Sequence, residues 1–354
     1  MPTSFESAVF AHTAASAAAV AHLLKPGTSV AASLARMLSP SMPNATGAVV
    51  LGNVGLSALL PLSVALKRAF LGRLSAAEAQ NASEKAISLL LFKLVTLAAL
   101  EAEPEALELL AWGAWFALMS TLQVFLGLAR DRFERLSAAP SSTRRQHVRT
   151  LALLSSLLLA DAACMRFALR VFAGSGRVTL CLLLHDTLVV ALHTLLLGVR
   201  YGSHLYEAWL FHAEGALPSG ERRRTVLFCV EFAVEACVEV LSLCQSVLLF
   251  WLHGLSLSLV DSILLLHLRA LALELAHRVS RFVGFLAVSR DLQRQYAAVP
   301  AEELAALQDD CAVCRERLDK AKRLPCGHLF HSACLQRWLE VKTECPTCRA
   351  RLQA

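Results

Sequence analysis

The stretch from Cys311 to Cys348 reads CAVCRERLDKAKRLPCGHLFHSACLQRWLEVKTECPTC and holds six of the eleven cysteines of the chain. Its cysteines and histidines follow the spacing C-x2-C, eleven residues, C-x-H-x2-H-x2-C, ten residues, C-x2-C. Zinc is held in closed sites by four nitrogen or sulfur ligands, and a C-x2-C turn presents two thiolates to one ion. The stretch therefore predicts two bound Zn²⁺ ions. The eight candidate ligands are Cys311, Cys314, Cys326, His328, His331, Cys334, Cys345 and Cys348.

The spacing alone does not decide how these ligands divide between the two ions. Sequential pairing would give the first C-x2-C turn Cys326 and His328, whereas interleaved pairing would give it His331 and Cys334. Two independent zinc fingers, or a chance cluster, are the plainer alternatives, and eight ligands at these spacings weigh against both. A domain this small has too little apolar core to fold without its metal.

The rest of the chain has the composition of a membrane protein. Fifty-six per cent of the 354 residues are apolar and the mean hydropathy is +0.53, which is too apolar for a soluble protein. The apolar residues come in blocks of roughly 20, the length of a helix that crosses a hydrocarbon core of about 30 Å. We therefore predict an α-helical multi-spanning membrane bundle of about eight helices. The segments are 5–23, 47–66, 84–100, 107–128, 150–172, 178–199, 225–251 and 254–275, the first of which is either a span or a cleaved signal sequence.

The charges between these segments predict the orientation of the chain. Six arginines lie between residues 130 and 149, on the side that also holds the C-terminus, whereas the loop 101–108 on the other side carries four glutamates. Because basic loops stay in the cytosol, both termini are predicted to be cytosolic. The net charge of +6 is thus explained by membrane orientation, and no nucleic acid is expected as a partner. Of the two N-x-S/T sequons, the one at Asn44 falls in a predicted lumenal loop and the one at Asn81 in a cytosolic loop.

Three domains follow from this division: a multi-spanning domain at 1–275, a juxtamembrane helical linker at 276–308 and the zinc domain at 309–352. The linker carries Arg278, Arg281, Arg290 and Arg294, which either face water or contact anionic lipid headgroups. A short helix is predicted to restart after Pro300, because proline and acidic residues favour the first turn of a helix. The six clustered cysteines need thiolates, which agrees with a reducing cytosol.

The seventh segment contains a polar face, because Glu231, Glu235 and Glu239 follow one another at every fourth residue. A charge inside a membrane is costly and usually faces a bundle interior or a water-filled cavity. The face is interpreted either as polar contacts between helices or as a hydrophilic groove that admits polypeptide. A proton-coupled transporter with an attached zinc domain is a third alternative. The candidate cationic partners are Lys93, Arg166, Arg170 and Arg269.

Several motifs resemble the autocrine motility factor receptor family of ubiquitin ligases, which is related to synoviolin. In the zinc stretch these are Asp309–Cys314, Arg323–His331, Cys334-Leu335, Trp338–Glu340 and Cys345–Arg349; upstream they are Asp131–Glu134, Arg200-Tyr201, His204-Leu205, His212, Glu214-Gly215 and Pro300–Leu304. The resemblance implies an interleaved, cross-brace RING-H2 domain. It further implies a RING-type E3 ubiquitin transferase in the endoplasmic-reticulum membrane, acting in the degradation of membrane or misfolded proteins. That family also carries a CUE-containing tail after its RING, whereas this sequence ends at Ala354.

The resemblance also assigns roles to individual residues. An apolar groove would bind a ubiquitin-conjugating enzyme (E2) charged with ubiquitin, and its positions here are Val313, Leu324, Pro325, Trp338 and Pro346. Arg349 matches the linchpin arginine that bridges E2 and ubiquitin and so acts by positioning the thioester; a solvated terminal charge is the alternative. For Trp338 the alternative is a wedge packed against the zinc turns, a role that is compatible with E2 contact. The implied partners are the charged E2, membrane or misfolded substrates, the lipid bilayer, and a second copy or retrotranslocation partners. A membrane scaffold whose RING only mediates binding is the competing function.

Overall fold

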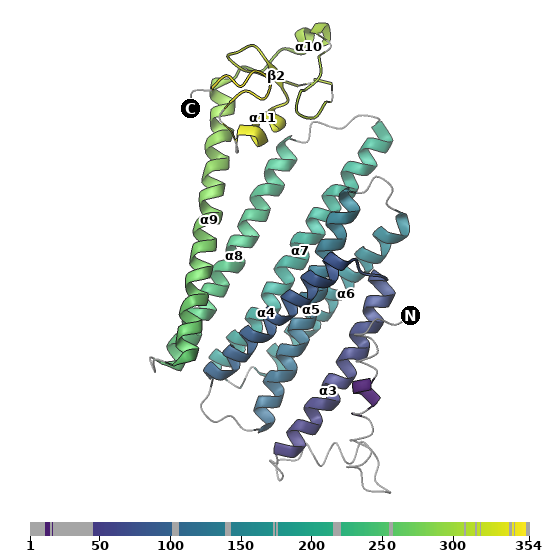
Figure 1. Ribbon diagram of the computed structural model, residues 1–354, viewed down its shortest axis with the longest axis vertical. Coiled ribbons are helices and arrows are strands. Elements are labelled where there is room, and N and C mark those ends of the chain that lie inside the picture. Colours follow the sequence, from purple (N-terminus) through teal and green to yellow (C-terminus); the bar gives the residue numbers. More distant parts are fainter. Residues whose placement is uncertain are drawn as a thin grey trace. The chain divides into compact units, whose positions relative to one another are not determined.

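The computed structural model describes residues 11–14, 16, 45–100, 106–138, 143–172, 174, 176–214, 221–254, 258–307, 309–315, 317–318, 320–339, 342 and 344–351. Most of the first predicted segment, 5–23, lies outside this set. The long helices of the described residues are α3 (Ala45–Leu66), α4 (Ala76–Leu100), α5 (Ala106–Ala138), α6 (Arg144–Val171), α7 (Arg177–Glu214), α8 (Glu221–His253) and α9 (Leu259–Gln295) (Figure 1). A five-residue π-helix, η1 (Lys67–Leu71), extends α3.

Each predicted apolar segment from 47–66 onward overlaps one of these helices. Among the described residues, three helical stretches are long and apolar enough to cross a membrane by length and composition: Glu108–Ala138, Arg144–Val171 and Arg177–Leu210. In α4 and α9, charged side chains such as Lys93 and Arg269 interrupt the apolar runs. A mostly helical chain with membrane-spanning candidates is therefore established, and the full set of eight spans stays a prediction.

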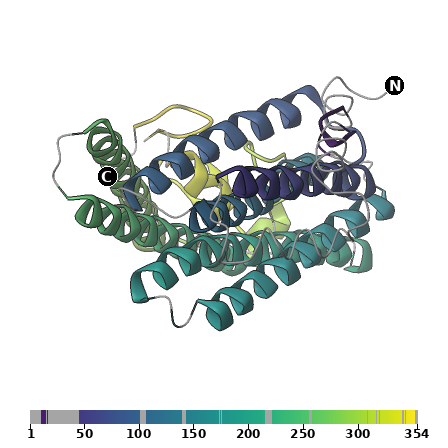
Figure 2. The same cartoon turned by 90° about the horizontal axis from the view of Figure 1, so that it is seen from below.

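The chain divides into two compact units, and the first comprises Met1–Gly202 with Leu241–Arg269. Within it α5 packs against α3, α4 and α6, and Figure 2 shows these helices from below. Arg132 near the end of α5 donates to the carbonyl oxygens of Leu71 and Arg73, at 3.0 and 3.2 Å, and pairs with Glu78 at the start of α4. The resemblance motif Asp131–Glu134 thus lies in a helix and holds the α3–α4 connection.

A buried ion pair joins α4 to α7 in the same unit. The Lys93 Nζ lies 2.6 Å from both carboxylate oxygens of Asp186, and the two residues are only 5% and 2% exposed. His185 Nδ1 lies 3.4 Å from the same carboxylate, and the Lys93 ammonium lies 4.9 Å from the centre of the Phe116 ring. Lys93, which interrupts the apolar run of α4, is therefore neutralised by an aspartate rather than by the glutamates of α8.

The second unit comprises Ser203–Val240 with Ala270–Ala354. Its parts of α8 and α9 are joined by stacked rings, with Phe232 and Phe282 parallel and 3.9 Å apart. Arg278 of α9 donates to Glu239 at 2.8 Å and pairs with Glu235 as well. The expected cationic partners of the glutamate face are thus corrected: the cation is Arg278, which the sequence placed on a solvated or lipid-facing linker. Antiparallel packing of α8 and α9 brings it opposite the glutamates.

The zinc stretch forms a small module around a two-stranded antiparallel sheet. Strand β1 (Lys322–Arg323) pairs with β2 (Leu329–Phe330), and helix α11 (Ser332–Leu339) follows directly. The short helix predicted after Pro300 is present as α10 (Ala301–Leu307). Gly327 occupies the turn between the strands at a φ of 86°, a conformation that side chains disfavour. The predicted boundary at 275/276 falls inside α9, which continues unbroken to Gln295.

Candidate zinc centre

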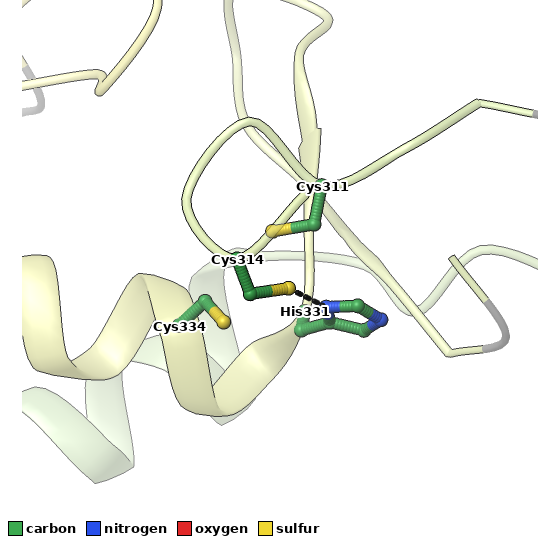
Figure 3. A group of neighbouring side chains, drawn as sticks. All are labelled: Cys311, Cys314, His331 and Cys334. Atoms are coloured by element: carbon green, nitrogen blue, oxygen red, sulfur yellow. Dashed lines mark hydrogen bonds between the residues drawn. The ribbon is translucent and has the colours of Figure 1, made fainter. Parts of the chain in front are cut away.

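Four of the predicted ligands converge at a first site. Cys311 and Cys314 come from the turn before β1, His331 directly follows β2, and Cys334 lies in the first turn of α11 (Figure 3). One ligand atom from each of these residues lies within 4.8 Å of the corresponding atom of every other. The spacing suits one tetrahedral ion with zinc–sulfur bonds of about 2.3 Å.

The other four candidates form a second site with the same tight grouping. Cys326 and His328 flank the β1–β2 turn, and Cys345 and Cys348 belong to the last C-x2-C turn. The His328 Nδ1 lies 3.4 Å from the Cys326 sulfur and 3.8 Å from the Cys345 sulfur. The eight residues therefore group in the interleaved arrangement that the resemblance implied, not in sequential order. The module is a RING finger with two clusters able to bind two zinc ions, as predicted.

The imidazole of His331 is oriented for metal binding. Its Nε2 lies 3.1 Å from the carbonyl oxygen of Arg317, which can only accept, so Nε2 carries the proton and donates it. The lone pair of Nδ1 is then left to face the cluster, where it lies 3.2 Å from the Cys314 sulfur (Figure 3). A backbone carbonyl that fixes the ring and tautomer of a histidine in this way is typical of zinc ligands.

The thiols of the first site have the electrostatic character of a cation site. Burial alone raises the pKa of the Cys311 thiol, but backbone N–H groups of Cys314, His331 and Val313 donate to its sulfur and lower the pKa to about 7. Burial and the neighbouring thiolates raise the pKa of Cys334 to about 12. Several thiolates this close repel one another, and the double positive charge of a bound Zn²⁺ would offset this repulsion and keep the ligands deprotonated. The donor set therefore fits zinc.

The first and last C-x2-C turns share one backbone geometry. The N–H of Arg315 donates to the Cys311 carbonyl at 2.7 Å, and the N–H of Arg349 donates to the Cys345 carbonyl at 2.9 Å. Both arginines follow the second cysteine of their turn and have left-handed backbones, with φ of 60° and 57°. Arg349 is thus held at a defined, exposed position directly beside the second zinc site.

The residues expected to line an E2-binding groove differ in exposure. Val313 is 40% exposed and Pro325 is also exposed, whereas Pro346 and Trp338 are half-buried. Leu324 is 2% exposed and belongs to the core of the module, because it directly follows β1 and points inward beside Phe330. Leu324 is therefore not an exposed residue, and its role toward E2 stays a prediction.

Trp338 is bonded to the last zinc turn, and its contact with E2 stays a prediction. Its indole Nε1 donates to the carbonyl oxygen of Glu344 at 2.7 Å, which ties α11 to the last zinc turn. The Lys342 ammonium lies 5.5 Å from the centre of the ring, within range of a cation–π contact. Lys342 was missed by the sequence reasoning, although its position four residues after Trp338 was a usable signal.

Comparison with known families agrees with this geometry. A protein-family model described as E3 ubiquitin-protein ligase synoviolin-like, TPR repeats, matches residues 7–283, and the Ring finger domain model matches residues 309–349. The chain belongs to the synoviolin-like family. The resemblance to synoviolin-related RING ligases seen in the sequence is thereby confirmed.

Individual relatives point the same way. The chain is 31% identical over 327 residues to the E3 ubiquitin protein ligase RIN2 of Arabidopsis thaliana, covering 86% of this chain and 56% of that protein. It is 29% identical over 328 residues to the E3 ubiquitin protein ligase RIN3 of the same plant, with 87% and 56% covered. The chain thus spans little more than half the length of these relatives. No solved structure matches it.

Proposed function

We propose that this synoviolin-like protein is a RING-type E3 ubiquitin transferase of the endoplasmic-reticulum membrane. Its RING faces the cytosol and holds an E2–ubiquitin thioester in one orientation for transfer to lysines of degradation substrates. No residue of the chain forms a covalent bond to ubiquitin in this scheme. The work of the RING is to position the two reactants, which lowers the entropic cost of the transfer.

The observation that carries the proposal is the double zinc site with an exposed apolar residue beside it. The two clusters fix a rigid frame, and Val313, between Cys311 and Cys314, stays 40% exposed on that frame. An exposed valine on so small a domain favours a protein interface. Arg349 supplies a fixed cation next to the other site. The two plant relatives are E3 ubiquitin protein ligases, which supports the reaction class.

The test uses the whole chain in lipid nanodiscs, loaded with zinc, together with ubiquitin-activating enzyme, ATP, ubiquitin and a panel of E2 enzymes. Discharge of ubiquitin from at least one E2 onto free lysine should be faster than with empty nanodiscs. If a folded chain with two zinc ions accelerates no E2 of the panel, the ligase proposal fails and the scaffold alternative takes its place.

Arg349→Ala is expected to slow this discharge by between about tenfold and a hundredfold while the RING stays folded, because misplacement of the reactants by about 1 Å costs rate on that scale. Zinc content and thermal unfolding should match the parent protein. Arg315→Ala is the matched control, since Arg315 has the same left-handed backbone at the equivalent place in the other zinc turn. Equal slowing in both variants would show a general effect of the turns and remove the linchpin role.

We also propose eight spans with both ends cytosolic, supported by the arginine-rich and glutamate-rich loops. Asn44 should then receive an N-linked glycan in microsomes, seen as an endoglycosidase-sensitive band that Asn44→Gln abolishes. Asn81 lies in α4, where its amide donates to Asp131 at 3.2 Å, and should stay unmodified. A glycan on Asn81 would contradict the orientation.

A further inference from the structure

The apolar core of the RING does not stop at the RING. Tyr296, at the C-terminal end of α9, and Leu292, one turn earlier, are 6% and 2% exposed and pack in the same buried cluster as Cys311, Leu324 and Phe330. Leu304 of α10 belongs to this cluster too, and Val288 packs against it. Tyr296 lies fifteen positions before the first zinc ligand, yet its side chain is part of the core that surrounds the zinc sites.

Backbone hydrogen bonds make the same connection. The N–H of Val299 donates to the Ala321 carbonyl at 3.0 Å, and the N–H of Arg323 donates to the Ala297 carbonyl at 3.2 Å. Residues 297–299 therefore lie beside β1 and form one isolated antiparallel bridge, between Ala298 and Lys322. The segment that leaves α9 is thus hydrogen-bonded to the edge of the two-stranded sheet.

Two side-chain contacts also join β1 to the segment before the RING. The Lys322 ammonium donates to the carbonyl oxygen of Tyr296 at 2.8 Å. This oxygen lies just past the last turn of α9, where carbonyls lack helical partners and attract cations. Arg323, the next residue of β1, pairs with Glu303 of α10. Both residues of β1 are thus bonded to the segment before the RING.

We infer that the part of α9 from Ala270 onward and the RING form one folded body, in which Tyr296 is a positioning residue that fixes the direction of the proposed E2-binding face. The C-terminal end of α9 lies directly beside the module that holds β2 and α11 (Figure 1). The inference rests on the proposed function only in calling this face E2-binding. A RING on a loose tether samples many directions, whereas a RING built onto a helix presents its E2 in the one direction that the helix sets.

The first test asks whether the helix is part of the zinc module. In the full chain, Tyr296→Ala should speed zinc loss to a chelator by about tenfold or more, because it opens a cavity in the core that surrounds both sites. Tyr296→Phe keeps the ring and should stay within about twofold of the parent protein. Arg290→Ala, on the exposed side of the same helix, is the matched control and should have no effect. Unchanged zinc retention in Tyr296→Ala would overturn the inference.

The second test measures how the RING is oriented relative to α9. Spin labels on noncanonical residues at the exposed positions Val283 and Ala350 should give one narrow distance distribution in nanodiscs. Five glycine and serine residues inserted between Ala287 and Val288 should broaden it several-fold, and two inserted alanines should shift it while keeping it narrow, since each helical residue adds about 100° of rotation. A parent distribution as broad as that of the glycine-serine variant would overturn the inference.

The two proposals fail in different ways. Discharge of ubiquitin onto free lysine reports the RING alone, so it should stay within about twofold of the parent rate in both insertion variants. If the parent protein does not discharge ubiquitin either, the ligase proposal fails, whereas the conclusions from zinc loss and from the distance distributions still hold. If the parent protein discharges ubiquitin but gives a broad distance distribution, the rigid junction is contradicted and the ligase proposal still holds.

Discussion

Cys311→Ser should abolish both the fold of the RING and the proposed ubiquitin transfer. Cys311 is fully buried, and three backbone N–H groups donate to its sulfur, so the thiolate is held in a fixed position within the first site. A serine hydroxyl does not ionise near neutral pH and binds zinc far more weakly than a thiolate. Structural zinc contributes on the order of 10 kcal/mol to the folding of small domains, more than the core of this module can replace. Zinc should fall from two ions per chain to one or none, with loss of E2 discharge.

Cys237→Ser provides the control for this loss. Cys237 is an exposed cysteine of α8 that belongs to neither cluster. Its substitution should leave the zinc content and the rate of discharge at the parent values. Retention of two zinc ions and full activity in Cys311→Ser would contradict the assignment of the first site.

Lys93→Met should destabilise the helical unit by about 3 to 5 kcal/mol, because removing one partner of a buried ion pair leaves the other charge uncompensated. The remaining Asp186 is 2% exposed and, among the described residues, would keep the His185 ring at 3.4 Å as a polar partner. Purified in detergent, the variant should lose monodisperse protein at a markedly lower temperature than the parent. Asp186→Asn alone should have a similar effect, since it leaves the lysine as the unpaired charge.

The double variant Lys93→Met, Asp186→Leu separates the pair from its components. Replacing both charges by apolar side chains removes the desolvation cost together with the attraction, so the double variant should recover most of the parent stability. Losses that simply add in the double variant would show that the two side chains act independently and would contradict the ion pair.

The zinc chemistry could be predicted from the sequence because its information is local. Each C-x2-C turn brings two ligands together within four residues, whatever the rest of the chain does. The interleaving could not be derived in this way, since it requires His331 to reach a turn that begins twenty residues earlier. It came from resemblance, and the structure supplies the distances that support it.

The contacts between helices could not be predicted from the sequence. Lys93 and Asp186 are 93 positions apart, and Arg278 lies opposite Glu235 and Glu239 only because of the register in which α8 and α9 pack. A usable signal was overlooked in α9 itself: between residues 254 and 299 the chain has no proline and only Gly254 and Gly284 as glycines. One continuous helix could have been expected there in place of a span followed by a separate linker.

The pairing of α8 with α9 also bears on the distance between the zinc module and the membrane. Phe285 of α9 lies against Phe228 of α8, with 4.1 Å between the ring centres, and Phe228 falls at the start of the predicted seventh span. From Phe285 to Gln295 a helix rises about 15 Å at about 1.5 Å per residue. With the seventh span in the bilayer, the zinc module would stand at about that height above the hydrocarbon. For the proposed ubiquitin transfer, we then expect acceptor lysines at a comparable height to be favoured over lysines in the headgroup layer.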